Sequence, residues 1–386
     1  MKGLVVYYSA TGSTKKIAKA IWEGMKGVIE TDLASVKEIS PQAVAGYDVI
    51  GIGAPIWYFR EPANVRLFIY NMPSLEGKMC FTFCTHGTAP FGIFYSMVPA
   101  LQKKGLTIIG WADWYGGVEQ VLHAVKPYFT DGHPDEIDLK EAETFGREMA
   151  ERALRVAAGE KDLIPEIRRG SKAEPTFRPP HTPGEEVGSG DSFFEPPPRP
   201  QRKVNLEKCR YPGCTACMDN CIVRAIDFSV SPPVFKKSCI NCSLCDRICP
   251  EEAIEIDEET IKFHRTQKKI DMTRCIYPEC TLCVDHCPMN SIDFSVNPPV
   301  FKNNCEGDDL CWVICPKGAI EITNLELTHG KLYNASVQSR EKHPFLQYLA
   351  EAEAEGKFRR LVPMEDIGWD TPVFKSQKLP RFVIDE

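Results

Sequence analysis

The stretch "KGLVVYYSATGSTKKIAKAIWEGM", residues 2–25, contains an apolar run, a loop of hydroxyl side chains and an amphipathic run. The first run predicts a buried strand and the last predicts a helix. Between them, residues 9–14 offer hydroxyls, a glycine and the free N–H groups of a helix N-terminus, which together suit a phosphate. The loop matches neither G-x-x-x-x-G-K-[ST] nor G-x-G-x-x-G, so nucleoside triphosphate and dinucleotide sites are disfavoured. A capped helix without a ligand is the alternative.

Four more apolar runs, at 27–33, 47–54, 78–85 and 106–113, alternate with helix-like stretches that include 62–72 and 138–159. Short buried strands alternating with helices are typical of a parallel sheet covered on both faces. We therefore predict an α/β doubly wound domain over residues 1–160, with five parallel strands in the order 2-1-3-4-5. In that order, the loops after the first, third and fourth strands lie near one another.

The loop "GAPIWYFREP" (53–62) follows the third predicted strand, and "CTHGTAPFG" (84–92) follows the fourth. Together with "SATGST" (9–14), they resemble the FMN-binding loops of flavodoxins. The resemblance implies a non-covalent FMN with its phosphate at Ser9, Thr11, Gly12, Ser13 and Thr14. It also implies an isoalloxazine ring lined by Pro55, Ile56, Trp57, Tyr58, Thr85, His86 and Gly87. Ser13 stands where many flavodoxins have asparagine, and Trp57 has a core or interface role as its alternative.

The 17 cysteines are unevenly distributed along the 386 residues. Cys80 and Cys84 lie on the fourth predicted strand and are expected to be core residues, whereas all others fall between 209 and 315. The opening residues read as a strand and not as a secretory leader, so we expect a cytoplasmic protein. In that compartment, concentrated cysteines favour metal binding over disulfides.

Composition and charge exclude several classes of protein. The net charge of −7 gives no sign of a nucleic-acid partner, and no apolar run approaches the roughly 18 residues of a membrane span. The length suits two or three domains. Residues 161–205 are rich in proline and charge and are predicted to be a linker.

An internal repeat with a constant offset of 66 residues (209 to 275, 221 to 287, 249 to 315) follows the linker. We predict a first module at 206–257, a connector at 258–271, a second module at 272–323 and a docking tail at 324–386. Cys239, Cys242, Cys245 and Cys249-Pro250 fit the bacterial ferredoxin pattern C-x2-C-x2-C-x3-C-P.

The runs that begin at Cys209 and Cys275 have four residues in their first gap, which is also a plant-type [2Fe–2S] spacing. Every run nevertheless ends in x3-Cys, and a small residue and an isoleucine follow four and five residues later. This spacing, which all four cysteine runs share, favours a [4Fe–4S] site at each of them. The region therefore resembles two small α+β bacterial-type 2[4Fe–4S] ferredoxin modules in tandem.

In such modules the last cysteine of each run ligates the other cluster. The resemblance implies a first ligand set of Cys209, Cys214, Cys217 and Cys249, and a second of Cys221, Cys239, Cys242 and Cys245. It implies a third set of Cys275, Cys280, Cys283 and Cys315, and a fourth of Cys287, Cys305, Asp308 and Cys311.

Asp308 stands 66 residues after Cys242, where a cysteine is expected. A carboxylate oxygen can bind iron, although it is a harder ligand than thiolate. The alternatives are a [3Fe–4S] centre with an iron-free corner, or Glu306 or Asp309 as the ligand.

A flavin and four iron–sulfur clusters on one chain predict an electron-transfer protein that relays low-potential electrons, as a subunit or donor of a larger redox enzyme. Four thiolates leave each cluster negative, so a partner with a basic docking patch is expected. The alternative is an FMN-dependent oxidoreductase that reduces a small substrate or oxidises NAD(P)H directly. No arrangement of nucleophile and base is recognisable, so no catalytic residue is predicted.

Overall fold

The computed structural model describes residues 1–57, 60–90, 93–118, 127–166, 201–221, 224–236, 239, 243–261, 265–324 and 344–366. Most of the predicted linker, Tyr58 and Cys242 therefore lie outside the described residues. The chain divides into two compact units. The first unit holds the described residues up to 118, from 129 to 166 and from 359 to 363. The second unit holds residues 201–358 where described, together with 127, 128 and 364–366.

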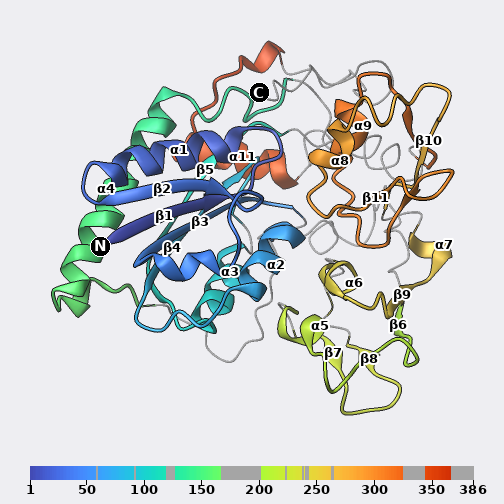
Figure 1. Cartoon of the computed structure of the whole chain (residues 1–386). Coiled ribbons are helices and arrows are strands. Elements are labelled where there is room, and N and C mark those ends of the chain that lie inside the picture. The colour runs from blue at the N-terminus through green and yellow to red at the C-terminus, as the bar shows by residue number, and fades with distance from the viewer. Residues whose placement is uncertain are drawn as a thin grey trace, which may run out of the picture. The chain divides into compact units, whose positions relative to one another are not determined.

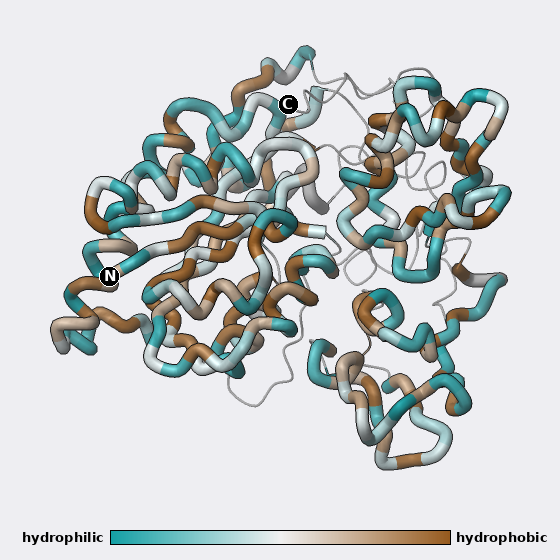
Figure 2. Tube along the Cα trace, viewed as in Figure 1, coloured by the Kyte–Doolittle hydropathy of each residue, from teal (hydrophilic) through white to brown (hydrophobic). Residues whose placement is uncertain are grey.

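Five parallel strands form the sheet of the first unit in the order β2-β1-β3-β4-β5, which confirms the prediction (Figure 1). They are β1 (Lys2–Tyr7), β2 (Glu30–Ser35), β3 (Val49–Pro55), β4 (Met79–His86) and β5 (Thr107–Tyr115). The three central strands, β1, β3 and β4, are almost entirely buried because helices cover both faces, and Figure 2 shows apolar character along the sheet.

Two helices cover each face of this sheet (Figure 1). Successive side chains of β1 alternate between the faces. Leu4 and Val6 pack with α2 (Ala63–Asn71) and α3 (Ile93–Gln102), whereas Val5 and Tyr7 pack with α1 (Ser13–Lys26) and α4 (Glu136–Ala157). The sequence analysis did not predict α3. Short 3-10 helices η1 (Ala43–Gly46) and η3 (Lys161–Leu163) complete the unit.

The second unit contains the two modules, each with two short antiparallel strand pairs. In the first module β6 (Arg202–Val204) pairs with β9 (Ile254–Ile256), and β7 (Ile226–Asp227) pairs with β8 (Val234–Phe235). In the second, β10 (Lys268–Ile270) pairs with β13 (Ile320–Ile322), and β11 (Ile292–Asp293) pairs with β12 (Val300–Phe301). These pairings add 202–204 and 268–270 to the predicted modules.

Short helices carry the cysteine runs. They are α5 (Ala216–Asp219) and α6 (Leu244–Ile248) in the first module, and α8 (Leu282–Asp285) and α9 (Leu310–Ile314) in the second. Between the modules lies α7 (Glu258–Ile261), and near the end of the chain lie α11 (Pro344–Ala354) and η6 (Met364–Asp366). The predicted small α+β modules are confirmed. Among the described residues, no helix is both long and apolar enough to cross a membrane.

Residues 359–363 belong to the first unit, although the chain has by then passed through the second. Two nitrogens of Arg359 donate to the two oxygens of Asp135, each at 2.7 Å. The Arg359 carbonyl lies 2.6 Å from Nε2 of His133, and Leu361 packs beside Gly132. We call these contacts of residues 359–361 the C-terminal clasp.

Candidate functional site

The loop between β1 and α1 has the conformation that a phosphate site requires. Gly12 precedes the helix with a φ of 100°, in the left-handed region that favours glycine. Its N–H donates to Oγ of Ser9 at 3.1 Å. The N–H groups of the first helical turn have no partner inside the helix, and the helix dipole adds positive potential there. The loop residues thus fit an anionic phosphate.

The three predicted flavin loops meet at the carboxyl ends of the strands. Oγ1 of Thr14, which is 1% exposed, lies 2.7 Å from Oγ1 of Thr85. The Ile56 N–H donates to the Thr85 carbonyl at 3.2 Å, so the loops after β3 and β4 are joined as well. A fourth loop, after β5, also reaches this edge, because a Cβ on Gly116 would lie 3.1 Å from Cβ of Ser13.

The predicted ring-binding residues differ in their exposure. Pro55, Ile56 and Gly87 are half-buried at the sheet edge. Trp57 is 6% exposed, belongs to the apolar core and meets the Tyr8 ring edge-on at 5.5 Å between centroids. This structure therefore shows the core role that was the alternative for Trp57, and its contact with a flavin ring stays a prediction.

His86 is held by two residues that the sequence analysis did not single out. Its Nε2 lies 2.9 Å from Oδ2 of Asp113, and its ring meets that of Tyr115 at 4.7 Å. Both partners lie on β5, and the signal available in the sequence is the polar and aromatic segment "ADWYGG" at the end of that strand. By contrast, Cys84 is fully buried in the core, and burial raises the pKa of its thiol well above the usual value.

A buried ion pair lies beyond β3. Nη2 of Arg66 is 2.5 Å from Oε1 of Glu61, and the two side chains are almost fully buried. The same nitrogen donates to the Ser96 carbonyl at 3.0 Å, which ties α2 to α3. The pair was not predicted, because its partners are five residues apart across the start of a helix and match no binding motif.

The structure brings the first and third ligand sets together. Burial raises the pKa of Cys217 to about 12, with further increases from the neighbouring thiolates of Cys249, Cys209 and Cys214. In the second module, burial and then the thiolates of Cys315, Cys275 and Cys280 raise the pKa of Cys283 to about 11. The last cysteine of each module therefore lies with the first three, as crossed ligation requires.

A backbone hydrogen bond accompanies the final cysteine of every run. The sulfurs of Cys221, Cys249, Cys287 and Cys315 accept from the N–H four residues later at 3.2–3.3 Å. The donors are Ala225, Ala253, Ser291 and Ala319, the small residues that recur at this position, and all four are buried. Cys221, Cys239 and Cys245 of the second set are described, but Cys242 is not, so the grouping of this set stays a prediction.

The fourth ligand set surrounds a small cavity in the second module. Cys287, Cys305, Asp308 and Cys311 all line it. Oδ1 of Asp308 accepts from the Leu310 N–H at 3.4 Å, whereas Oδ2 is buried and has no hydrogen-bond partner in the described residues. Burial raises the pKa of this carboxyl to about 6. A buried carboxylate oxygen without a partner is costly, and an iron ion among three thiolates fits it.

The two alternative ligands, Glu306 and Asp309, already make ion pairs. Oε1 of Glu306 lies 3.4 Å from Nη1 of Arg247, and Oδ1 of Asp309 lies 2.7 Å from Nζ of Lys268. Thr266 also donates to Asp309. Glu306 and Asp308 both line the cavity, and among the described residues Asp308 is the one of the three acids that makes no ion pair.

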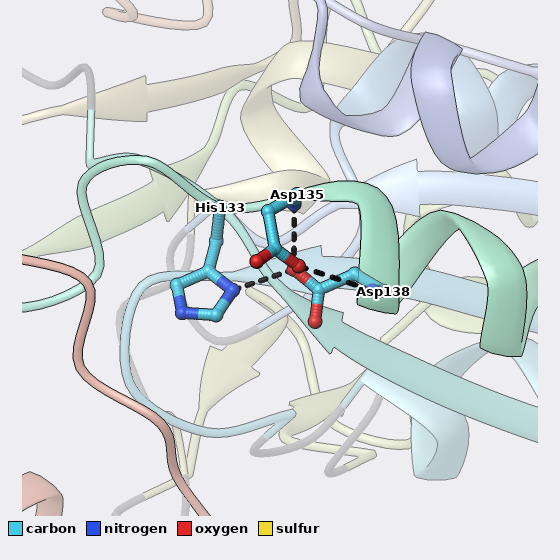
Figure 3. A group of neighbouring side chains, drawn as sticks. All are labelled: His133, Asp135 and Asp138. Atoms are coloured by element: carbon cyan, nitrogen blue, oxygen red, sulfur yellow. Dashed lines mark hydrogen bonds and ion pairs between the residues drawn. The ribbon is translucent and has the colours of Figure 1, made fainter.

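His133, Asp135 and Asp138 form another group of potential metal ligands (Figure 3). Nδ1 of His133 lies 2.6 Å from Oδ2 of Asp138, and both oxygens of Asp135 accept from Arg359. The Arg359 guanidinium also lies 3.6 Å from Oδ1 of Asp138. The Arg359 guanidinium already supplies a positive charge beside these carboxylates. The three residues are therefore the part of the first unit that binds the C-terminal clasp.

The chain was compared with known protein families and relatives. Residues 4–93 match the family model of a flavodoxin domain, and residues 238–291 match that of a 4Fe–4S dicluster domain. The chain is a flavodoxin–ferredoxin fusion. It is an electron-transfer redox protein, and its cofactors are a flavin and iron–sulfur clusters.

Three relatives illustrate the two parts of the fusion. A flavodoxin of Aquifex aeolicus is 28% identical over 181 residues, which cover 44% of this chain and 95% of the relative. An NAD(P)H dehydrogenase (quinone) of Paraburkholderia phymatum is 26% identical over 193 residues, covering 40% and 97%. Subunit I of an NADH-quinone oxidoreductase of Pelobacter propionicus is 35% identical over 72 residues, covering 17% of this chain and 38% of the relative.

The matched dicluster segment crosses the boundary between the two modules of the fusion. It takes the cysteine run of 239–249 from the first module and that of 275–287 from the second. The structure groups the cysteines differently, since Cys249 lies with Cys217 and Cys315 lies with Cys283. We follow the structural grouping, because the pairs β6–β9 and β10–β13 close each module on itself.

Proposed function

We propose that the fusion relays low-potential electrons between an FMN and four iron–sulfur clusters, as a subunit or donor of a larger redox enzyme. The observation that carries this proposal is the cavity lined by Cys287, Cys305, Asp308 and Cys311, with an unpartnered carboxylate oxygen. This cavity would complete a fourth ligand set, which supports more sites than one dicluster module requires. When bound, the FMN supplies one- and two-electron chemistry, and the clusters supply one-electron chemistry.

The flavodoxin domain would hold the FMN with the loops that meet at its sheet edge. Ser9, Thr11, Gly12, Ser13 and Thr14 would bind the phosphate at the N-terminus of α1. Pro55, Ile56, Thr85, His86 and Gly87 would line the ring. Asp113 fixes the orientation of His86, and the Thr14–Thr85 hydrogen bond holds two of the loops at a fixed separation.

A larger redox enzyme is the proposed partner. The related subunit I of an NADH-quinone oxidoreductase supports a role as one component of an assembly. Thiolate-ligated clusters carry negative charge, so the partner should present a basic patch. The proposed location is the cytoplasm, where reducing conditions keep clustered cysteines available as ligands.

Cofactor analysis of the anaerobically reconstituted full chain tests this proposal. We expect one FMN and about 16 irons per chain, or about 15 if the fourth site lacks a corner. A low-potential ferredoxin should reduce both the flavin and the clusters. Flavin released as FAD, or only two-iron spectroscopic species, would refute the cofactor assignment.

The second candidate function is direct oxidation of NAD(P)H by the FMN, which the NAD(P)H dehydrogenase relative favours. The same preparation distinguishes the two functions when NADH or NADPH replaces the ferredoxin. The relay predicts slow flavin reduction by either nucleotide. Rapid and saturable reduction would establish the second function instead.

Exchanging aspartate and cysteine between the equivalent positions 308 and 242 tests whether Asp308 is an iron ligand. With a single oxygen ligand, the fourth cluster should lose one iron first under mild ferricyanide and give a three-iron EPR signal. Asp308→Cys should abolish this conversion, and the mirror variant Cys242→Asp should create it at the second site. Equal iron loss from wild type and Asp308→Cys would show that Asp308 is not a ligand.

A further inference from the structure

Several charged positions break the 66-residue repeat, among them Asp246, Arg247 and Glu306. Asp246 and Arg247 of the first module correspond to Trp312 and Val313 of the second, and Glu306 of the second corresponds to Ile240 of the first. Each charge therefore occurs in only one module. A charge that one copy of a folding unit carries and the other lacks is not required by the shared fold, although it can still act within its own module, as Asp309 does with Lys268.

Two of these unmatched charges meet each other, and the third, Asp246, pairs with Arg202 of the first module as well as with Arg265. Nη1 of Arg247 lies 3.4 Å from Oε1 of Glu306, with side chains that are 1% and 0% exposed. Asp246 pairs with Arg265, which also donates from Nη1 to the Asn303 carbonyl at 3.0 Å. One more contact, from Asn303 Nδ2 to Glu252 Oε2 at 3.4 Å, extends the same region. We call this set of contacts the module junction.

The junction lies beside two particular ligand sets. Asp246 and Arg247 directly follow Cys245 of the second set, whose sulfur is 3.9 Å from Oδ1 of Asp246. Glu306 lies between Cys305 and Asp308, two ligands of the fourth set. The junction therefore joins the loop that carries the second set to the loop that carries the fourth.

The chemistry of the junction makes it specific. Two buried charges that face each other tolerate the loss of either partner poorly, because the remaining charge is then buried without compensation. A shift of one module along the other would separate Arg247 from Glu306 and leave both in that state. The pair thus favours one relative position of the two modules.

We propose that the module junction fixes the order of the ligand sets as first, second, fourth, third, so that the second and fourth are neighbours across it. Crossed ligation already joins the first set to the second and the third to the fourth within each module. The inference rests on the proposed function, since it requires that all four sites hold clusters. In this order, the cluster at Asp308 lies between two other clusters of the electron-transfer route and not at the end of that route.

Magnetic coupling between reduced clusters in the full chain tests this order, because dipolar coupling falls with the cube of the distance. A Cys280→Ala/Cys283→Ala chain lacks the third cluster, and the EPR signal of its fourth cluster should remain broadened. Removing the second cluster as well, with Cys239→Ala/Cys245→Ala, should narrow that signal to the width of an isolated cluster. Removing the first instead, with Cys209→Ala/Cys214→Ala, should leave it broad. Narrowing only on loss of the first cluster would overturn the order.

Charge variants test the junction without removing a cluster. In the fully loaded chain, Glu306→Gln and Arg247→Met should each weaken the coupling between the second and fourth clusters. Glu321→Gln is the matched control, since it breaks an exposed pair with Lys269 within the second module. Unchanged coupling in both junction variants would overturn the proposal. Iron content is measured first, so a chain without four clusters counts against the proposed function and not against the junction.

Discussion

The two units of this chain are held together by different means. The flavodoxin unit has strands of six to nine residues, and two large apolar clusters fill the space between its sheet and helices. The ferredoxin modules have strands of two or three residues. The apolar cluster of the second module contains Ile270, Ile292 and Ile320 together with Cys311, and three more ligand cysteines pack against it. In the modules, the ligands themselves form part of the core.

Iron removal should therefore give the largest difference between the two units. Structural metal centres contribute their binding free energy to folding, and modules this small have little core to replace it. We expect anaerobic chelation to unfold the modules while the flavodoxin sheet stays folded, as measured by amide hydrogen exchange. Removal of FMN, the matched control, should unfold neither unit. Protected modules after complete iron loss would contradict the comparison.

A smaller effect is expected at the buried pair of Lys268 and Asp309, whose side chains are 1% and 4% exposed. Lys268→Met leaves the Asp309 carboxylate without its cation and should destabilise the second module by about 3–5 kcal/mol. In the first module, the equivalent Arg202 donates to the Ser243 hydroxyl at 2.7 Å and pairs with Asp246, whose equivalent in the second module is Trp312. The double variant Lys268→Met/Asp309→Asn removes both charges and should recover most of the loss in urea unfolding of the loaded protein. No recovery would mean that the lost stability does not come from the uncompensated carboxylate.

The flavodoxin unit should be sensitive to larger side chains at the positions where its helices pack closely. A Cβ on Gly146 of α4 would lie 2.1 Å from the backbone oxygen of Ile21 in α1. Gly146→Ala should push the helices apart and destabilise this unit by about 1–3 kcal/mol, without changing the iron content. Gly27→Ala is the control, because Gly27 has a helical φ of −69° and open surroundings. Equal thermal stability of the two variants would argue against close packing.

The smallest effect concerns His133, which contacts acceptors at both ring nitrogens: the Asp138 carboxylate and the Arg359 carbonyl. Burial lowers the pKa of His133. The two hydrogen bonds raise this pKa by more than burial lowers it, so the net shift is upward. Only the protonated ring donates at both nitrogens. The stabilisation is thus fully present below about 6.5, the unfolded pKa, and is lost as pH rises through the folded value.

Hydrogen exchange of residues 359–363 measures this dependence. Exchange should accelerate as the pH rises above about 6.5 and through the raised pKa of His133, beyond the intrinsic rate increase, because the neutral ring keeps only one of its two bonds. His133→Gln should abolish the extra pH dependence. Asp135, Asp138 and Arg359 are the charged groups around the ring, and the guanidinium holds the pKa of Asp135 well below this range. An unchanged profile in the variant would rule out His133 as the titrating group.

The sequence could predict features that depend on local signals, but not those that depend on contacts between distant parts of the chain. Local apolar runs predict the five strands, and their order follows from the doubly wound fold that such runs favour. Local cysteine spacing likewise predicts the cluster motifs, and the resemblance to bacterial ferredoxins implies the ligand sets. The choice among Glu306, Asp308 and Asp309 stayed open in the sequence, since it depends on cations that lie far away in the chain. In the structure, Arg247 pairs with Glu306 and Lys268 pairs with Asp309, which favours Asp308 as the ligand. Trp57 is similar: its loop position suggests a flavin contact, whereas its burial against Tyr8 depends on tertiary packing.

The C-terminal clasp changes the connectivity of the whole molecule. The chain leaves the flavodoxin unit beyond residue 166 and returns to it at residue 359, so the intervening segment is anchored to this unit at both ends. A doubly anchored segment searches a smaller volume than one on a single tether, which raises its effective concentration near the anchor points. A single proteolytic cut within residues 167–200 would therefore leave the ferredoxin modules attached through the clasp. Their release would require both the cut and the loss of the Arg359–Asp135 pair.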